Sequence, residues 1–179
     1  MVATLLTGII AFAATNIDDI VILTLFFSQG QRRRMIVLGQ YLGFTALILI
    51  SLAGFFGGRV LPHEWIRFLG MIPIAIGLKK LLAKNEHNST RRGRGLWNIA
   101  VVTFANGGDN IGVYTPLFAV SDTRQLVELL AVFYVLISVW CFVGALIPRH
   151  PLIARGLKRG THWIAPLVLI GLGIYILSK

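Results

Sequence analysis

The stretch FANGGDNIGVYTP, residues 104–116, places a carboxylate, two asparagines and a pair of glycines inside a segment that is apolar on both sides. A second stretch of the same kind, ATNIDDIVILTLFF at 14–27, contains Asp18 and Asp19. A charge at the centre of a bilayer costs about 2.5–3.5 kcal/mol on insertion scales, so each such residue needs a compensating role. The fold and the function of this chain must account for both stretches.

Composition predicts an integral membrane protein. Of the 179 residues, 56% are apolar and only 13% are charged, whereas soluble domains carry about 25% charged residues. The net charge of +10 lies in short basic runs between apolar segments, which favours membrane topology over nucleic-acid binding. Cys141 is the only cysteine, which excludes an intrachain disulfide and a two-cysteine redox relay.

Six segments are long and apolar enough to cross about 30 Å of hydrocarbon. They cover residues 2–28, 36–58, 65–83, 96–120, 126–147 and 162–178. The first and fourth are interrupted by polar residues near mid-membrane. We therefore predict an all-α membrane protein with a first three-helix unit at 1–83, a basic cytoplasmic linker at 84–95 and a second three-helix unit at 96–179.

The basic residues predict the orientation. The loops after spans one, three and five hold 13 of the 17 Lys and Arg residues, with Lys79 and Lys80 assigned to the loop after span three. Because cytoplasmic loops carry an excess of Lys and Arg, both termini are predicted to lie outside.

The two halves of the chain resemble each other. Residues 14–27 aligned with 105–118 agree at five of 14 positions, including Asp18 with Asp109 and Thr24 with Thr115. Each half has three predicted spans, an odd number, so the second half would be inserted upside down relative to the first. Inverted repeats with polar breaks at corresponding positions point to the central site of a secondary transporter.

The polar breaks supply oxygen atoms of the kind that hold a divalent cation. The predicted metal ligands are Asp18, Asp19, Asp109, Asn110, Asn16 and Asn106. The predicted supporting residues are Thr15, Thr24, Thr115, Gly107, Gly108, Pro116 and Gln40. We expect the two glycines to weaken the fourth span and Pro116 to deny a hydrogen bond to the carbonyl of Gly112. No Lys, Arg or His is expected at the depth of these carboxylates, which favours cation or proton handling over a structural ion pair.

Other glycines in the second span have a simpler interpretation. Gly39 and Gly43 are four residues apart, and Gly54, Gly57 and Gly58 follow in the same segment. Small residues at such spacing let helix backbones approach closely in membranes. We expect these glycines to serve helix packing rather than ligand binding.

Four motifs resemble the cadmium-resistance transporter family of the lysine-exporter superfamily. They are TNIDDIVIL at 15–23, GQYLG at 39–43, GMIPIAIGLK at 70–79 and GGDNIGVYTP at 107–116. The resemblance implies a six-span carrier built from a 3+3 inverted repeat that exports Cd²⁺, with Zn²⁺ as a further candidate, across the bacterial inner membrane. Some family members carry a cysteine near the position of Asn106, and an all-oxygen site would discriminate poorly between Cd²⁺ and harder ions.

The expected mechanism is alternating access with proton antiport, since the chain has no G-x-x-x-x-G-K-[ST] stretch for nucleotide binding. The partners are then a divalent cation, protons and the lipid bilayer; no cofactor is expected, and a homodimer is compatible with the many glycines. A carrier for Mn²⁺, Ca²⁺ or an organic solute such as an amino acid is the nearer alternative. An intramembrane aspartyl protease, suggested by NGGD at 106–109, is the more distant one, and we do not expect an enzyme.

Overall fold

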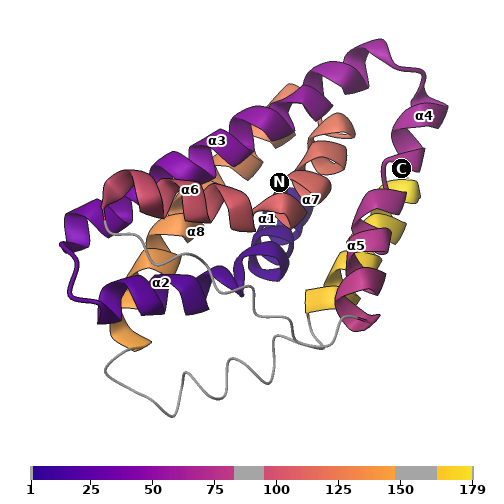
Figure 1. The fold of residues 1–179 in the computed structure, drawn as a ribbon. Helices are drawn as coiled ribbons and strands as arrows, with labels where there is room; N and C mark the ends of the chain where they lie inside the picture. The colour runs from indigo at the N-terminus through magenta and orange to yellow at the C-terminus, as the bar shows by residue number, and fades with distance from the viewer. Residues whose placement is uncertain (1, 83–94, 148–164, 179) are drawn as a thin grey trace.

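The computed structural model describes residues 2–82, 95–147 and 165–178, and its regular structure in those ranges is entirely helical (Figure 1). The helices are α1 (Val2–Asn16), α2 (Asp19–Ser28), α3 (Arg33–Val60), α4 (His63–Phe68), α5 (Met71–Leu82), α6 (Leu96–Asn106), α7 (Gly108–Ala119) and α8 (Thr123–Leu146), followed by a last helix at Ala165–Leu177. The all-α class is confirmed. The predicted linker at 84–95 lies, except for its last residue, outside the described residues.

Two of these helices are clear candidates for membrane spans. By length and apolar composition α3 and α8 could each cross a membrane, and α1 with α2 could form a third span that is bent by 58° at the junction. The break occurs at Ile17 and Asp18, where the sequence predicted it. This makes the chain a multi-pass helical membrane protein.

The second predicted break is narrower than expected. Only Gly107 separates α6 from α7, and backbone hydrogen bonds from its amide to Thr103 and from Ile111 to its carbonyl bridge the junction. The interruption between α6 and α7 is therefore one residue long.

The predicted third span is also divided, between α4 and α5, and the sequence analysis missed this division.

Tight helix contacts are made through the glycine face of α3. A Cβ atom at Gly39 would meet Ile99 and the Leu96 carbonyl of α6, within 2.9 Å. At Gly54 a Cβ would overlap the Thr115 carbonyl of α7. Gly43 and Gly58 make equivalent close approaches, so the packing role predicted for these four glycines is confirmed, whereas Gly57 has room for a side chain.

The long helix of each half packs against two shorter helices of the other half. The long helix α3 lies along α6 and α7, and the long helix α8 lies along α1 and α2. Buried aromatic rings from α1, α3, α7 and α8 meet between them: Phe12 and Phe44 are 5.6 Å apart between centroids, and Tyr114 and Phe133 are 4.5 Å apart. This core holds α1 beside α7, which places the polar end of α1 near the acidic start of α7.

A helix pair formed by α5 and the last helix stands beside this core (Figure 1). Gly70 and Gly173 approach so closely that a Cβ on either would lie within 2.7 Å of the other's carbonyl oxygen. The pair reaches α7 through Ile76, whose side chain lies against Gly112. The last turn of α5 is thereby directed toward the first turn of α7.

The glycine face of α3 predicts a contrast between neighbouring positions. Gly54→Ala forces a Cβ against the Thr115 backbone, and overpacking of this kind costs about 1–3 kcal/mol. Gly57→Ala, in the same helix, meets only Leu61 at 3.9 Å and gains about 0.5–1 kcal/mol from the better helix former. Thermal unfolding of the purified protein in detergent should give a lower midpoint for Gly54→Ala and an equal or higher one for Gly57→Ala. Equal midpoints for the two variants would contradict this packing.

Candidate functional site

One acidic residue from each break contacts the same ammonium group. The Lys80 ammonium, from the last turn of α5, lies 2.5 Å from Oδ2 of Asp109 and 3.4 Å from Oδ2 of Asp18. Asp109 is the second residue of α7, and its side chain is 7% exposed. The Asp18 side chain, at the junction of α1 and α2, is 39% exposed. Two carboxylates that are 91 residues apart in the chain are thus joined by one ammonium group.

The expectation that no basic residue shares the depth of the carboxylates is wrong. The sequence analysis assigned Lys79 and Lys80 to a loop, but both lie within α5. Successive residues of a helix are rotated by roughly 100°, so Lys79 is exposed while Lys80 points at the carboxylates. The sequence did contain a signal for the helical placement of Lys80, because the predicted span at 65–83 already included both lysines.

Asp19 has a different partner. Asn106, the last residue of α6, donates a hydrogen bond from Nδ2 to Oδ1 of Asp19 at 2.5 Å. Asp19 is only 3% exposed, and its other carboxylate oxygen is buried without a hydrogen-bond partner. The two breaks therefore contact each other directly.

Beneath the carboxylates lies a buried layer of hydrogen-bonded polar groups. Asn110 donates to the Asn16 side chain at 3.1 Å, and Asn16 donates to the Tyr114 hydroxyl at 2.8 Å. The Thr15 hydroxyl is 2.9 Å from the same tyrosine oxygen. The Trp140 indole donates to the backbone carbonyl of Asn16 at 2.7 Å. Tyr114 and Trp140 were not predicted, because each looks like a core aromatic residue in an apolar sequence.

Hydrogen bonds within this layer occupy some of the predicted metal ligands, so only part of the set still has an oxygen available for a cation. Asn16 already bonds Phe12, Thr15, Tyr114 and Asn110, and its backbone carbonyl is taken by Trp140. Oxygen atoms that are buried and have no hydrogen-bond partner remain on three predicted ligands. They are Oδ1 of Asp18, Oδ2 of Asp19 and Oδ1 of Asn110.

The predicted supporting residues divide into two groups. Thr15 belongs to the buried layer, Gly107 is the break itself, and Gly108 follows it beside open space. The others make contacts of their own, away from the carboxylates. The Thr24 hydroxyl bonds Ile20 of its own helix, Gln40 accepts from Thr103, the Thr115 backbone packs on Gly54, and Pro116 is buried within α7.

The carboxylates do not form a closed metal cage. Within residues 2–82, 95–147 and 165–178, no group of three or more His, Cys, Asp or Glu side chains is arranged to hold a metal ion. The ammonium of Lys80 lies between two of the carboxylates, and Asn106 binds the third. Coordination of a divalent cation by all three would require these contacts to rearrange.

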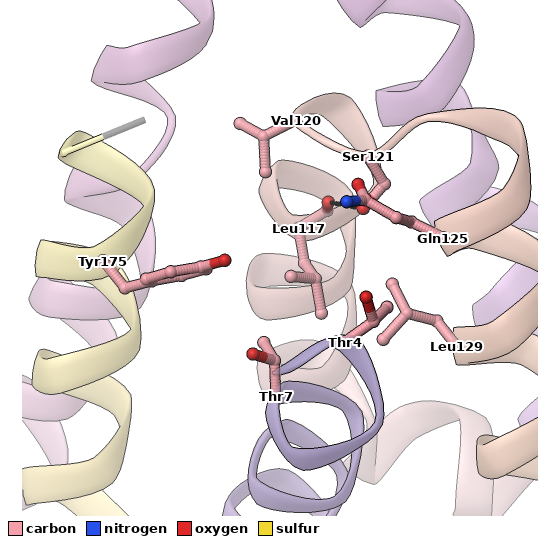
Figure 2. A pocket seen from close by; sticks show the side chains of 8 residues that line it. All are labelled: Thr4, Thr7, Leu117, Val120, Ser121, Gln125, Leu129 and Tyr175. Carbon is pink, nitrogen blue, oxygen red and sulfur yellow. Dashed lines mark hydrogen bonds between the residues drawn. The ribbon is translucent and has the colours of Figure 1, made fainter. Parts of the chain in front are cut away.

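A small hollow lies at the other end of α1 and α7 (Figure 2). It is lined by Thr4, Thr7, Leu117, Val120, Ser121, Gln125, Leu129 and Tyr175. Its volume of about 20 Å³ suits roughly one water molecule. Thr7 is nine residues before Asn16, roughly 13 Å along the helix, and fully buried Phe12 and Tyr114 intervene.

The model of the cadmium resistance transporter family matches residues 12–179 of the chain. The chain belongs to this family. The matched region contains both acidic breaks and Lys80, so the resemblance carried by the four sequence motifs is confirmed. As a member of this family, the chain is a cadmium resistance transporter. Neither the curated proteins nor the solved structures contain a match to it.

The buried polar layer predicts a stability difference between two threonines. Thr15→Val removes a hydroxyl that is 1% exposed and bonded to Tyr114, which leaves the tyrosine with one partner fewer. An unsatisfied buried polar group costs about 1–3 kcal/mol. Thr24→Val removes only a bond to the carbonyl of its own helix and should be close to neutral. The midpoint of thermal unfolding in detergent should fall for Thr15→Val alone, and an equal fall for both would exclude a special role for the layer.

Proposed function

We propose that this family member is a secondary-active exporter that carries Cd²⁺ out of the cytoplasm in exchange for protons at the acidic site. The observation that carries the proposal is the convergence of Asp18, Asp19 and Asp109 from two separately broken helices. Broken helices that meet at a shared polar site are typical of secondary transporters. Carboxylate and amide oxygens also bind Zn²⁺, and we propose Zn²⁺ as a further substrate.

We further propose that the two halves are inverted repeats with three spans each. In each half a broken helix precedes a long one, α1 and α2 before α3, and α6 and α7 before α8. Each long helix packs on the broken helix of the other half. A two-fold axis in the membrane plane would produce this exchange of partners, so the packing supports six spans in a 3+3 arrangement.

Alternating access is supported by the difference between the two ends of the site. Asp18 and Lys80 are 39% and 31% exposed, whereas Tyr114 and Phe12 beneath them are fully buried. We infer that the carboxylates are open toward one side and sealed toward the hollow near the start of α1. With both termini outside the bacterial inner membrane, the open side is the cytoplasmic one, where an exporter collects its metal.

Protons are the proposed counter-ions. A carboxylate can hold either a proton or part of a metal coordination shell, so the two cations compete for the same oxygens. Release of Cd²⁺ on the outside would follow proton binding there, and proton release inside would accompany metal binding.

Asp109→Asn should reduce Cd²⁺ transport by at least a hundredfold, because it removes the most buried charge of the bridged pair. Asp122→Asn is the matched control: Asp122 caps α8 in an exposed turn, and Asn caps helices equally well. Uptake of Cd²⁺ into proteoliposomes measures both variants. Transport at the wild-type rate by Asp109→Asn would exclude this site.

A pH gradient should drive Cd²⁺ movement in the same proteoliposomes. A vesicle with an acidic interior should accumulate Cd²⁺, since protons that leave down their gradient are exchanged for the metal. Collapse of the gradient with a proton–potassium exchanger should abolish accumulation. If the transport rate does not depend on the pH gradient but Asp109→Asn still abolishes transport, the metal site is supported and the proton coupling is excluded.

An organic cation is the second candidate substrate, and Lys80 is the observation that favours it. The site accepts a primary ammonium between Asp18 and Asp109, and the amino group of an amino acid has the same chemistry. Membership of the cadmium resistance family favours a metal. Thermal shifts with Cd²⁺, Zn²⁺, Mn²⁺, Ca²⁺ and lysine would separate the candidates, because only ligands of the native state stabilise it.

A further inference from the structure

One ammonium group joins the two halves of the acidic site. Nζ of Lys80 contacts Oδ2 of Asp18 at the first break and Oδ2 of Asp109 beside the second. No other Lys or Arg in the described ranges forms an ion pair with these carboxylates. Lys80 therefore occupies the position that bridges the two breaks.

A divalent cation and this ammonium cannot occupy the bridging position together. A metal of the size of Ca²⁺ or Cd²⁺ binds carboxylate oxygens at about 2.3–2.6 Å. Nζ lies 2.5 Å from Oδ2 of Asp109 and 3.4 Å from Oδ2 of Asp18, so a metal bound between these two oxygens would overlap the space that the ammonium fills. Like charges repel, and a bound metal would also drive the ammonium away electrostatically.

We propose that Lys80 is a tethered counter-cation that bridges Asp18 and Asp109 in the empty carrier and withdraws when the metal binds. The inference rests on the proposed function, since it assigns a role within the same site. The ammonium is carried on a flexible four-carbon stem, and the side chain is 31% exposed, so the protein does not enclose it and it has room to withdraw. Its tether keeps it near the site after displacement.

This arrangement has two consequences for transport. The tethered ammonium competes with the metal, which weakens binding and promotes release. It also pairs whichever of Asp18 and Asp109 stays unprotonated when no metal is present, so the proton-loaded carrier can return without burying an unpaired charge. A monovalent ion that is not tethered would compete poorly with Lys80, whereas a divalent ion would displace it, so Lys80 favours divalent substrates.

The test compares Lys80→Met with Lys79→Met, because Lys79 is the exposed neighbour on the same helix turn. Lys80→Met should bind Cd²⁺ at least tenfold more tightly in equilibrium titrations of the purified protein. In proteoliposomes it should lose at least 90% of net Cd²⁺ transport but retain exchange of Cd²⁺ for Cd²⁺, which never requires the empty carrier to return. Lys79→Met should match the wild type in all three measurements.

A second measurement uses the wild-type protein and does not depend on the variant folding. Acetylation of lysines is followed by mass spectrometry with and without saturating Cd²⁺. Displacement predicts that Cd²⁺ increases labelling of Lys80 severalfold and leaves Lys79 unchanged. Unchanged or reduced labelling of Lys80, or equal or weaker Cd²⁺ binding by folded Lys80→Met, would overturn the inference.

Failure of this inference can be told apart from failure of the proposed function. If the wild type binds no Cd²⁺, both fail. If the wild type binds Cd²⁺, Asp109→Asn does not, and Lys80→Met binds as the wild type does, then the metal site stands and only the counter-cation role is lost.

Discussion

The burial of carboxylates in an apolar helical protein is the constraint on which the rest of this structure depends. An unpaired charge away from water is costly, so each carboxylate requires a partner. Asp109 and Asp18 share the Lys80 ammonium, and Asp19 accepts from Asn106. Because these partners come from α5 and α6, the charges draw together helices from both halves of the chain.

Close packing makes this arrangement possible. The glycine face of α3 admits the backbones of α6 and α7, and the ring cluster around Phe12 and Tyr114 holds α1 beside α7. Beneath the carboxylates the Thr15, Asn16 and Tyr114 side chains satisfy one another. The site is therefore supported on one side by a buried, hydrogen-bonded layer and bounded on the other by the partly exposed side chain of Lys80.

Much of the fold and part of the site could be predicted from local sequence. The break at Asp18 and the packing glycines Gly39 and Gly54 follow from residue type and spacing, which act within one helix. Asn16 shows where such reasoning ends. Its amide looks like a free ligand in the sequence, yet it is bonded by side chains from α7 and α8 that no local pattern connects to it.

The sequence by itself determined that this is a helical membrane protein, which residues carry its charge and where two of its helices break, because hydropathy, charge and helix-breaking residues act locally. Only the tertiary structure decided which charges meet. Lys80 is separated from Asp109 by 29 residues and from Asp18 by 62, and it reaches both because α5 packs beside α7. Ion pairing depends on distance in space, and the packing of helices sets that distance.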